Sequence, residues 1–240
     1  MQAVDNKQVA DFYDKLWADL DQKNMSGINS RHRYILHNLK KAGLKKNSKV
    51  LEIGCGLGTL TNFISRALPS GHITGVDISP ESVAFATKKY AKNNISFAVS
   101  DMTNFISQQK FDFIVFPDVL EHIPIEAHNN IFATIRKLVD INSTVLINIP
   151  NPIALEYLHI HNREALQIID QPLHSYPFLK AIYENGFYLI SLKTYSIFYK
   201  QADYQSMILK PYAAIASMDV KSKSSVVMKS IWLRFVNLFS

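Results

Sequence analysis

The chain has 240 residues, of which 48% are hydrophobic and 19% are charged. This length and apolar content suit one domain with a substantial core, and they exclude a chain that is disordered throughout. The single cysteine, Cys55, excludes an intramolecular disulfide framework and a structural zinc site built from several cysteines. Neither a signal peptide nor a run of about 18 apolar residues is recognisable, so the sequence predicts a cytoplasmic location.

Positive charge is concentrated near the C-terminal end of the sequence. The formal net charge is +6, and the last twenty residues contain no acidic residue and four basic ones: Lys221, Lys223, Lys229 and Arg234. The rest of the chain lacks a basic stripe interleaved with aromatic side chains, which is the pattern typical of nucleic-acid binding. We therefore expect no nucleic-acid partner.

Hydrophobic spacing predicts two helices before the first strand. Apolar side chains recur at helical spacing over residues 6–21, and a second helix is predicted to start after Ser30 and to end at Gly43. From residue 49 onwards, strand and helix patterns alternate. The predicted strands cover 49–53, 72–77, 95–99, 111–116 and 143–149, and the predicted helices cover 59–68, 80–91 and 124–138. This alternation is typical of an α/β fold with a doubly wound, mostly parallel, Rossmann-like sheet and helices on both faces.

The pattern changes after Pro150. Residues 151–175 are aromatic and rich in histidine, and they have no regular period. A further helix is predicted over 176–184, and strand-like runs follow at 187–192 and 204–209. We therefore divide the chain into an N-terminal helical lid (1–44), a core (45–210) that carries an insertion at about 151–175, and a basic C-terminal tail (211–240).

The most informative stretch is the glycine-rich turn VLEIGCGLGTLT at residues 50–61, which joins a predicted strand to a predicted helix. Glycine allows positive φ and lets a ligand approach bare backbone, and the helix that follows offers unpaired N–H groups. A dinucleotide-binding G-x-G-x-x-G motif needs glycine where Thr59 stands, and the Gly-Lys-Ser/Thr ending of a P-loop is absent. The pattern E/D-x-G-x-G-x-G fits, through Glu52, Gly54, Gly56 and Gly58. A purely structural glycine turn is the alternative.

Three more motifs follow the next three predicted strands. Asp77 ends the second strand, Asp101 and Met102 come after the third, and FDFIVFPDVLEHI at 111–123 spans the fourth. Each motif lies just past the carboxyl end of a strand, where open α/β sheets bind ligands. A single aspartate at such a place is more often a cap or turn residue. Four motifs in register indicate a ligand site.

With these motifs, residues 45–150 resemble the core of class I S-adenosylmethionine-dependent methyltransferases. The resemblance is to the small-molecule group with a DVLEH fourth motif, as in ubiquinone-biosynthesis O-methyltransferases and many sugar or natural-product methyltransferases. It implies a seven-stranded sheet with one antiparallel strand. It also implies S-adenosyl-L-methionine as cofactor and S-adenosyl-L-homocysteine as product.

The resemblance assigns roles to the motif residues. It implies that Glu52 orders the glycine loop and the methionine ammonium, that Asp77 holds the ribose, and that Asp101 and Met102 hold the adenine. The backbone around Pro117 and Asp118 is implied to face the methionine and the methyl group. The predicted cofactor site further includes Gly54, Cys55, Gly56, Gly58, Ile78, Tyr13 and Arg33. Arg33 is a candidate partner of the methionine carboxylate, with a solvated charge run as the alternative. Cys55 is interpreted as small filler rather than as a nucleophile.

His122 is the candidate general base. Methyl transfer is an in-line displacement, so alignment matters most, and a hydroxyl acceptor must also lose its proton. His122 lies four residues past Asp118, and imidazole titrates near neutrality. A histidine that caps a helix or bonds backbone is the alternative. We therefore predict methylation of a small-molecule hydroxyl, such as that of a sugar or a secondary metabolite. Methylation of an amine, or a non-catalytic scaffold subunit that binds the cofactor, remains an alternative.

The acceptor site is predicted from two less patterned segments. Trp17 in the N-terminal segment, with His159, His161 and His174 in the insertion, are the candidate acceptor-contacting residues. Core packing is the alternative for Trp17, and solvent-exposed loop positions are the alternative for the histidines. The His-x-His pair has no convincing third ligand, so no metal is predicted.

The C-terminal tail predicts an amphipathic helix over residues 226–240. Its apolar face carries Met228, Ile231, Trp232, Phe235 and Phe239, and its polar face carries Lys229, Ser230, Arg234 and Asn237. Such a helix can lie in a membrane interface, dock on the protein's own body or join two copies. We therefore expect a monomer or a homodimer, with peripheral membrane contact as an open possibility.

Overall fold

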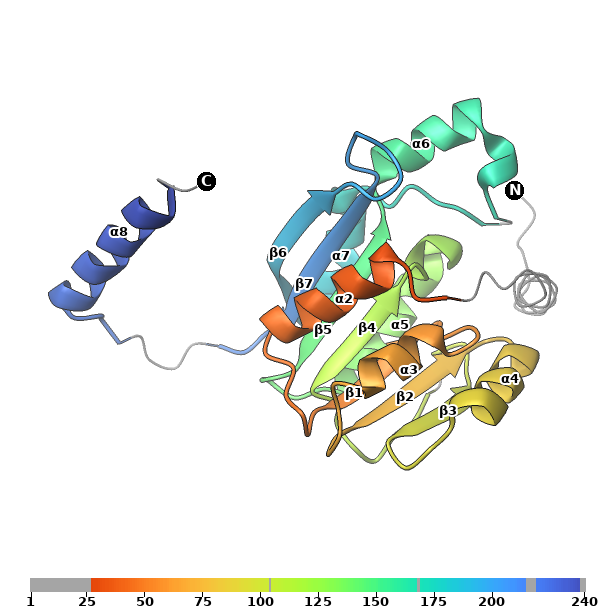
Figure 1. Cartoon of the computed structure of the whole chain (residues 1–240). Coiled ribbons are helices and arrows are strands. Elements are labelled where there is room, and N and C mark those ends of the chain that lie inside the picture. Colours follow the sequence, from red (N-terminus) through yellow and green to blue (C-terminus); the bar gives the residue numbers. More distant parts are fainter. Residues whose placement is uncertain (1–26, 104, 168, 215–218, 238–240) are drawn as a thin grey trace.

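A computed structural model describes residues 27–103, 105–167, 169–214 and 219–237 of the chain (Figure 1). Its centre is one seven-stranded sheet in the order β3-β2-β1-β4-β5-β7-β6. The strands are β1 (Lys49–Ile53), β2 (His72–Asp77), β3 (Ile95–Val99), β4 (Phe113–Pro117), β5 (Thr144–Pro150), β6 (Phe187–Tyr195) and β7 (Tyr204–Pro211). Only β7 runs antiparallel to its neighbours, β5 and β6. The predicted fold class and the single antiparallel strand are confirmed.

Helices cover both faces of the sheet, and one further helix near the C-terminal end of the chain lies away from it (Figure 1). They are α2 (Ser30–Lys41), α3 (Thr59–Ser65), α4 (Pro80–Tyr90), α5 (Ile125–Lys137), α6 (Pro152–His161), α7 (Ser175–Glu184) and α8 (Lys223–Asn237), with two short 3₁₀ turns at Leu120–His122 and Arg163–Ala165. One apolar cluster packs α5 and α7 against the sheet through Phe132, Ile135 and Phe178. A second cluster packs α2 and α3 against the opposite face through Ile35, Leu39 and Leu60. Burial of these side chains is the main stabilising term that holds the layers together.

The strand order places a crevice where the candidate ligand motifs end. The neighbours of β1 are β2 on one side and β4 on the other, and all three strands are parallel. The chain therefore leaves β1 and β4 in opposite directions, and such a switch point opens a crevice at the carboxyl ends of the strands. The residues that follow β1, β2, β3 and β4 meet at this edge.

Local capping chemistry sets the start of three helices, α2, α4 and α6. Ser79 accepts a hydrogen bond from the Ser82 backbone N–H, and Pro80 opens α4, as the sequence predicted. The interpretation of residues 151–175 as irregular was wrong, because α6 occupies Pro152–His161. Asn151 caps α6 and Pro152 opens it, but only Pro152 and Leu155 are buried on this helix. With so little core contact, α6 lacks the apolar period that identifies a helix in a sequence.

Candidate cofactor and acceptor site

The glycine loop after β1 is held in conformations that favour glycine. The φ angles of Gly54, Gly56 and Gly58 are 76°, 47° and 76°. The backbone N–H groups of Gly54 and Cys55 both donate to the carbonyl oxygen of Val76, at 2.8 and 2.9 Å, which fixes the loop against β2. Gly58 then caps α3 in the left-handed region. The loop therefore presents bare backbone and a helix N-terminus at the switch point, as the sequence predicted.

Substitution of Gly54 tests how tightly this loop is packed. A Cβ atom at Gly54 would lie 2.2 Å from Cγ2 of Val119, and φ is already positive. We expect Gly54→Ala to lower the free energy of unfolding by about 3 kcal/mol, from backbone strain and overpacking together. In urea unfolding, Gly43→Ala isolates the strain, since φ there is 101° and nothing lies within 4 Å of the added Cβ. Gly27→Ala adds neither effect. Equal losses in all three variants would contradict the packing argument.

Glu52 anchors α3 to β1. Its side chain is buried, and the hydroxyl of Thr61 donates to Glu52 Oε2 at 2.7 Å. Burial raises the pKa of Glu52 to about 8, while the hydrogen bond from Thr61 opposes the rise. This contact ties Glu52 to α3, and the predicted roles of Glu52 in ordering the glycine loop and the methionine ammonium stay predictions.

Asp77 lies between the glycine loop and the start of α4. Its two carboxylate oxygens accept the backbone N–H groups of Gly56, at 2.7 Å, and of Ser79, at 3.0 Å. Contact of Asp77 with a ribose diol stays a prediction. Ile78, the next residue, is half-buried. Cys55 is buried and burial raises the pKa of its thiol, which fits its interpretation as small filler.

Asp101 and Met102 follow β3 in a tight turn. Asp101 Oδ1 accepts from both the backbone N–H and the hydroxyl of Thr103, at 2.9 and 2.7 Å. Met102 has a φ of 66°, and its side chain is 1% exposed within the apolar core. The turn therefore presents the Asp101 carboxylate at the switch-point edge, whereas the Met102 side chain points into the core. Packing of an adenine ring on Met102 stays a prediction.

The segment after β4 brings another acidic residue to the edge. Asp118, which follows Pro117, has a φ of 56°, and its N–H donates to the Asn148 carbonyl oxygen at 2.7 Å. Nη1 of Arg31 donates to Asp118 Oδ2 and to the Tyr204 hydroxyl, each at 2.9 Å. Burial raises the pKa of Asp118, and the guanidinium of Arg31 opposes that rise. The first turn of α2 is thereby tied to β4 and β7.

Arg31, rather than Arg33, is the basic residue of α2 that reaches this edge. Arg33 lies over the ring of Phe63 on α3, with its guanidinium carbon 6.0 Å from the ring centroid. Sequence analysis missed Arg31, although a signal was present. Arg31 precedes the buried Ile35 and Leu39 by one and two turns, which places it on the inner face of α2.

A cavity of about 330 Å³ opens beside Asp118. Polar side chains line one side of it: Arg31, Asp118, Glu121, His122, Asp170 and Tyr204. Leu155 and Leu158 of α6 form an apolar wall. A cavity of this size, mostly apolar with a few convergent polar groups, is typical of a small-molecule site. We take it as the candidate acceptor cavity.

His122 is fixed at one ring nitrogen. Nδ1 lies 2.6 Å from the Ile169 carbonyl oxygen and 3.0 Å from Asp170 Oδ1, while Nε2 lies 3.8 Å from Glu121 Oε1. Burial lowers the pKa of His122, but the carboxylates of Glu121 and Asp170 outweigh it and raise the pKa to about 9. Two acceptors at Nδ1 favour the tautomer that carries its proton there, which leaves the lone pair on Nε2.

The other predicted acceptor residues lie elsewhere. His159 Nε2 lies 2.6 Å from the Asp170 carbonyl oxygen, so it fixes the segment next to the cavity without lining it. The ring of His161 stacks on Tyr157, and the exposed His174 pairs with Glu156 at 2.9 Å. Tyr13 and Trp17 lie outside the described residues. Within the described ranges, no three His, Cys, Asp or Glu residues are grouped so as to hold a metal ion.

Comparisons with known proteins give this fold and site a class. Residues 50–141 match a family model described as a methyltransferase domain. Magnesium protoporphyrin IX methyltransferase from Synechocystis, solved with S-adenosylhomocysteine bound, superposes with a TM-score of 0.68 at 19% identity, over 87% of this chain and 100% of that one. At such identity the superposition shows the shared fold.

Two curated relatives match part of the chain. The malonyl-[acyl-carrier protein] O-methyltransferase of Acetivibrio thermocellus is 28% identical over 95 residues, which are 40% of this chain and 32% of the relative. Phosphoethanolamine N-methyltransferase of Plasmodium falciparum is 34% identical over 106 residues, which are 43% of this chain and 40% of the relative. The matched region thus spans well under half of each relative.

Residues 50–141 thus match a methyltransferase domain, and the seven-stranded sheet has the fold of the superposed methyltransferase. The predicted resemblance to class I S-adenosylmethionine-dependent methyltransferases is confirmed over residues 50–141.

Proposed function

We propose that this protein transfers the methyl group of S-adenosylmethionine to a hydroxyl oxygen of a small molecule, with His122 as the general base. The observation that carries this proposal is the position of His122. Its ring lines the cavity next to Asp118 and is oriented through Nδ1 by the Ile169 carbonyl and the Asp170 carboxylate. A carboxylate that orients a histidine through one nitrogen prepares the other nitrogen to accept a proton.

The polar groups and the glycine loop at the switch-point edge fit the cofactor. The Asp77 carboxylate suits a ribose diol, the Asp101 carboxylate suits an adenine amine, and the glycine loop leaves room for close approach. Asp118 follows β4 between this edge and the acceptor cavity. When bound, S-adenosylmethionine supplies a methyl group on a positively charged sulfur. The residues of this chain then need only to align the acceptor and to remove its proton.

The proton transfer follows from this arrangement. As the acceptor oxygen bonds to the methyl carbon, the carbon–sulfur bond breaks and its electrons stay on sulfur. The hydroxyl proton passes to Nε2 of neutral His122, and the resulting imidazolium is stabilised by the carboxylates of Asp170 and Glu121. Because only neutral imidazole can accept the proton, the rate should rise with pH up to the pKa of about 9.

We expect His122→Gln to lower kcat by about 10²–10⁴-fold and to remove the rise in rate between neutral pH and the pKa of about 9. The measurement is release of S-adenosylhomocysteine across a panel of hydroxyl and amine acceptors, followed by a pH–rate profile on the best one.

His159→Gln is the matched control for the His122 variant. It removes a histidine that bonds the Asp170 carbonyl but does not line the cavity. If His122 only holds the segment at residues 169–170, both variants should lose activity alike and keep the same pH profile. Loss of the pH dependence in His122→Gln alone is the expected result.

Amine methylation is the second candidate, and Glu121 favours it. Both carboxylate oxygens of Glu121 and Oδ1 of Asp118 are buried without a hydrogen-bond partner among the described residues. A neutral amine would donate its N–H groups to such oxygens, and its lone pair can attack the methyl group without a general base. Full activity of His122→Gln on an amine, with loss in Glu121→Gln, would replace the hydroxyl proposal. A scaffold subunit would bind S-adenosylhomocysteine yet show no turnover with any acceptor.

We further propose that α8 makes a peripheral contact with a membrane or with a second copy of the chain. In the described part of α8, Met228 and Trp232 are 66% and 61% exposed, and Figure 1 shows the helix away from the sheet. Within the described ranges, no helix is long and apolar enough to span a bilayer. Co-sedimentation with anionic vesicles and analytical ultracentrifugation distinguish the two contacts. A protein that stays monomeric and does not co-sediment with vesicles would overturn both proposed contacts.

A further inference from the structure

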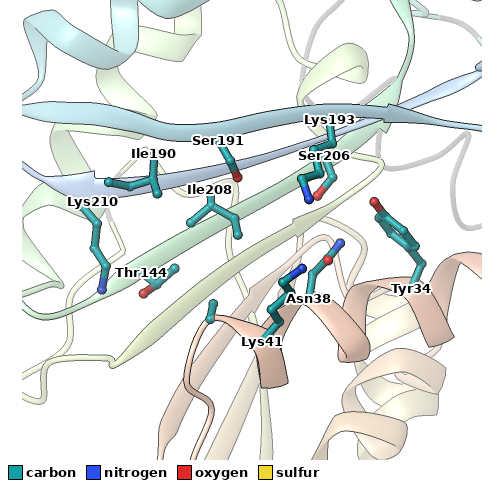
Figure 2. Close-up of a pocket in the computed structure, with 11 residues that line it drawn as sticks. Tyr34, Asn38, Lys41, Thr144, Ile190, Ser191, Lys193, Ser206, Ile208 and Lys210 are labelled. Atoms are coloured by element: carbon teal, nitrogen blue, oxygen red, sulfur yellow. The ribbon is translucent and has the colours of Figure 1, made fainter. Parts of the chain in front are cut away.

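A second cavity, of about 360 Å³, lies on the sheet face that α2 covers (Figure 2). We call it the lysine groove. One wall is α2, with Tyr34, Asn38 and Lys41, and the floor is formed by β5, β7 and β6. Ile190 and Ile208 supply apolar surface, and Thr144, Ser191 and Ser206 supply hydroxyl groups. Figure 2 shows these side chains converging from the helix and the strands on one hollow.

The lysine groove is separate from the acceptor cavity. The two cavities share no lining residue. Aromatic rings lie between the two cavities. The ring of Tyr34, which lines the groove, stacks on Tyr195 with centroids 3.7 Å apart. Tyr195 in turn contacts Tyr204, which lines the acceptor cavity, with centroids 5.9 Å apart. A ligand of the groove would therefore occupy its own site.

The groove is strongly cationic. Lys41 comes from α2, Lys193 from β6 and Lys210 from β7, and none of the described residues that line the groove is acidic. The Lys210 ammonium is held in place by the Asn142 carbonyl oxygen at 2.7 Å. An anion in this hollow would be attracted by three ammonium groups, of which that of Lys210 also interacts with Asp140. The hydroxyl groups of the floor add neutral donors beside the charges.

We propose that the lysine groove is a second binding site, which takes a phosphorylated small molecule through its phosphate groups. Ammonium groups and hydroxyls together suit the several acceptor oxygens of a phosphate or diphosphate. The volume of the groove admits a small ligand, and the isoleucines at 190 and 208 offer contact to its non-phosphate part. This site goes beyond methyl transfer, because no residue of the candidate cofactor or acceptor site contributes to it.

Helix α2 contributes side chains to the linings of both cavities. Arg31, Tyr34, Asn38 and Lys41 recur at intervals of three and four residues, so they share one face of α2. Arg31 reaches Asp118 at one end, and Lys41 lines the groove at the other. A ligand that binds the groove only in the folded state should stabilise the protein and raise its Tm.

The test is a titration of the full chain with inorganic phosphate and inorganic diphosphate at fixed ionic strength, followed by calorimetry and by amide chemical shifts. We expect diphosphate to bind more tightly than phosphate and to shift the amides of Ser191 and Ser206. The Lys41→Gln/Lys193→Gln double variant should weaken diphosphate binding at least about tenfold, since two charge-assisted contacts are lost.

Lys40→Gln/Lys200→Gln is the matched control, since it removes the same charge from exposed positions that do not line the groove. It should weaken diphosphate binding less than about twofold. Absence of diphosphate binding by the wild type, or equal weakening in the two double variants, would overturn the proposal. S-adenosylhomocysteine affinity should stay unchanged in both variants; a parallel loss of that affinity would also overturn the separate site.

Discussion

Asp77→Ala is expected to weaken S-adenosylhomocysteine binding by at least about 100-fold. In the proposed site the Asp77 carboxylate accepts hydrogen bonds from the ribose diol, and hydrogen bonds to a charged group contribute about 1.5–3 kcal/mol each. Loss of about 3 kcal/mol corresponds to roughly two orders of magnitude in Kd. Isothermal titration calorimetry of the wild type and the variant measures this difference directly.

Two controls separate ribose binding from loop structure. Asp77 also accepts the N–H groups of Gly56 and Ser79, so its loss disturbs the glycine loop. Asp77→Asn keeps the shape and one acceptor oxygen, and it should bind with intermediate affinity. Asp112→Ala removes a carboxylate that accepts the Lys49 N–H at 2.8 Å, at the opposite edge of the sheet, and should leave the affinity unchanged. A folded Asp77→Ala variant with wild-type affinity would refute the ribose assignment.

The strands and turns that carry the candidate cofactor motifs could be predicted closely, because short stretches of sequence determine them. The boundaries of β1, β2 and β3 were predicted to the residue, since buried parallel strands form short apolar runs that end at polar or glycine residues. The glycine spacing after β1 then requires a turn with positive φ, and the structure has one. Sequence order and the switch-point rule bring the remaining motifs to the same edge.

The candidate acceptor cavity depends on contacts between residues that are far apart in the chain. Arg31 meets Asp118 and Tyr204 across 87 and 173 residues, and His122 meets Asp170 across a loop that no local pattern fixes. Sequence analysis therefore named His122 as a candidate but named none of Arg31, Asp170 and Tyr204, which line the same cavity. The predicted histidines do not line the cavity, since His159, His161 and His174 bond the Asp170 carbonyl, the Tyr157 carbonyl and the Glu156 carboxylate.

Met102 shows a different limit of sequence reasoning. Its position after β3 was predicted, but the direction of its side chain depends on a positive φ that non-glycine residues seldom adopt. At this φ the Met102 side chain enters the core beneath the edge. A motif thus fixes where the backbone lies more firmly than where each side chain points.

Arg31→Ala is expected to destabilise the fold by about 2 kcal/mol, because it leaves the largely buried Asp118 carboxylate without its cation. The side chains of Arg31 and Asp118 are 28% and 18% exposed, so partial screening by solvent keeps the loss below that of a fully buried pair. Burial raises the pKa of Asp118 and Arg31 opposes the rise, so removal of Arg31 should raise this pKa further.

The sign of the pH dependence follows from this pKa. A carboxyl group whose folded pKa lies above its unfolded value of 3.8 binds more protons in the folded state, so stability falls as pH rises through that interval. Urea unfolding should therefore show a larger cost of Arg31→Ala at about pH 8 than at about pH 5. Asp118→Asn in the Arg31→Ala background should restore most of the loss at the higher pH and remove its pH dependence, because no charge is then left unpaired. A cost of Arg31→Ala that is independent of pH, and unchanged by Asp118→Asn, would mean that Arg31 stabilises the protein through packing and its contact with Tyr204 rather than through the ion pair.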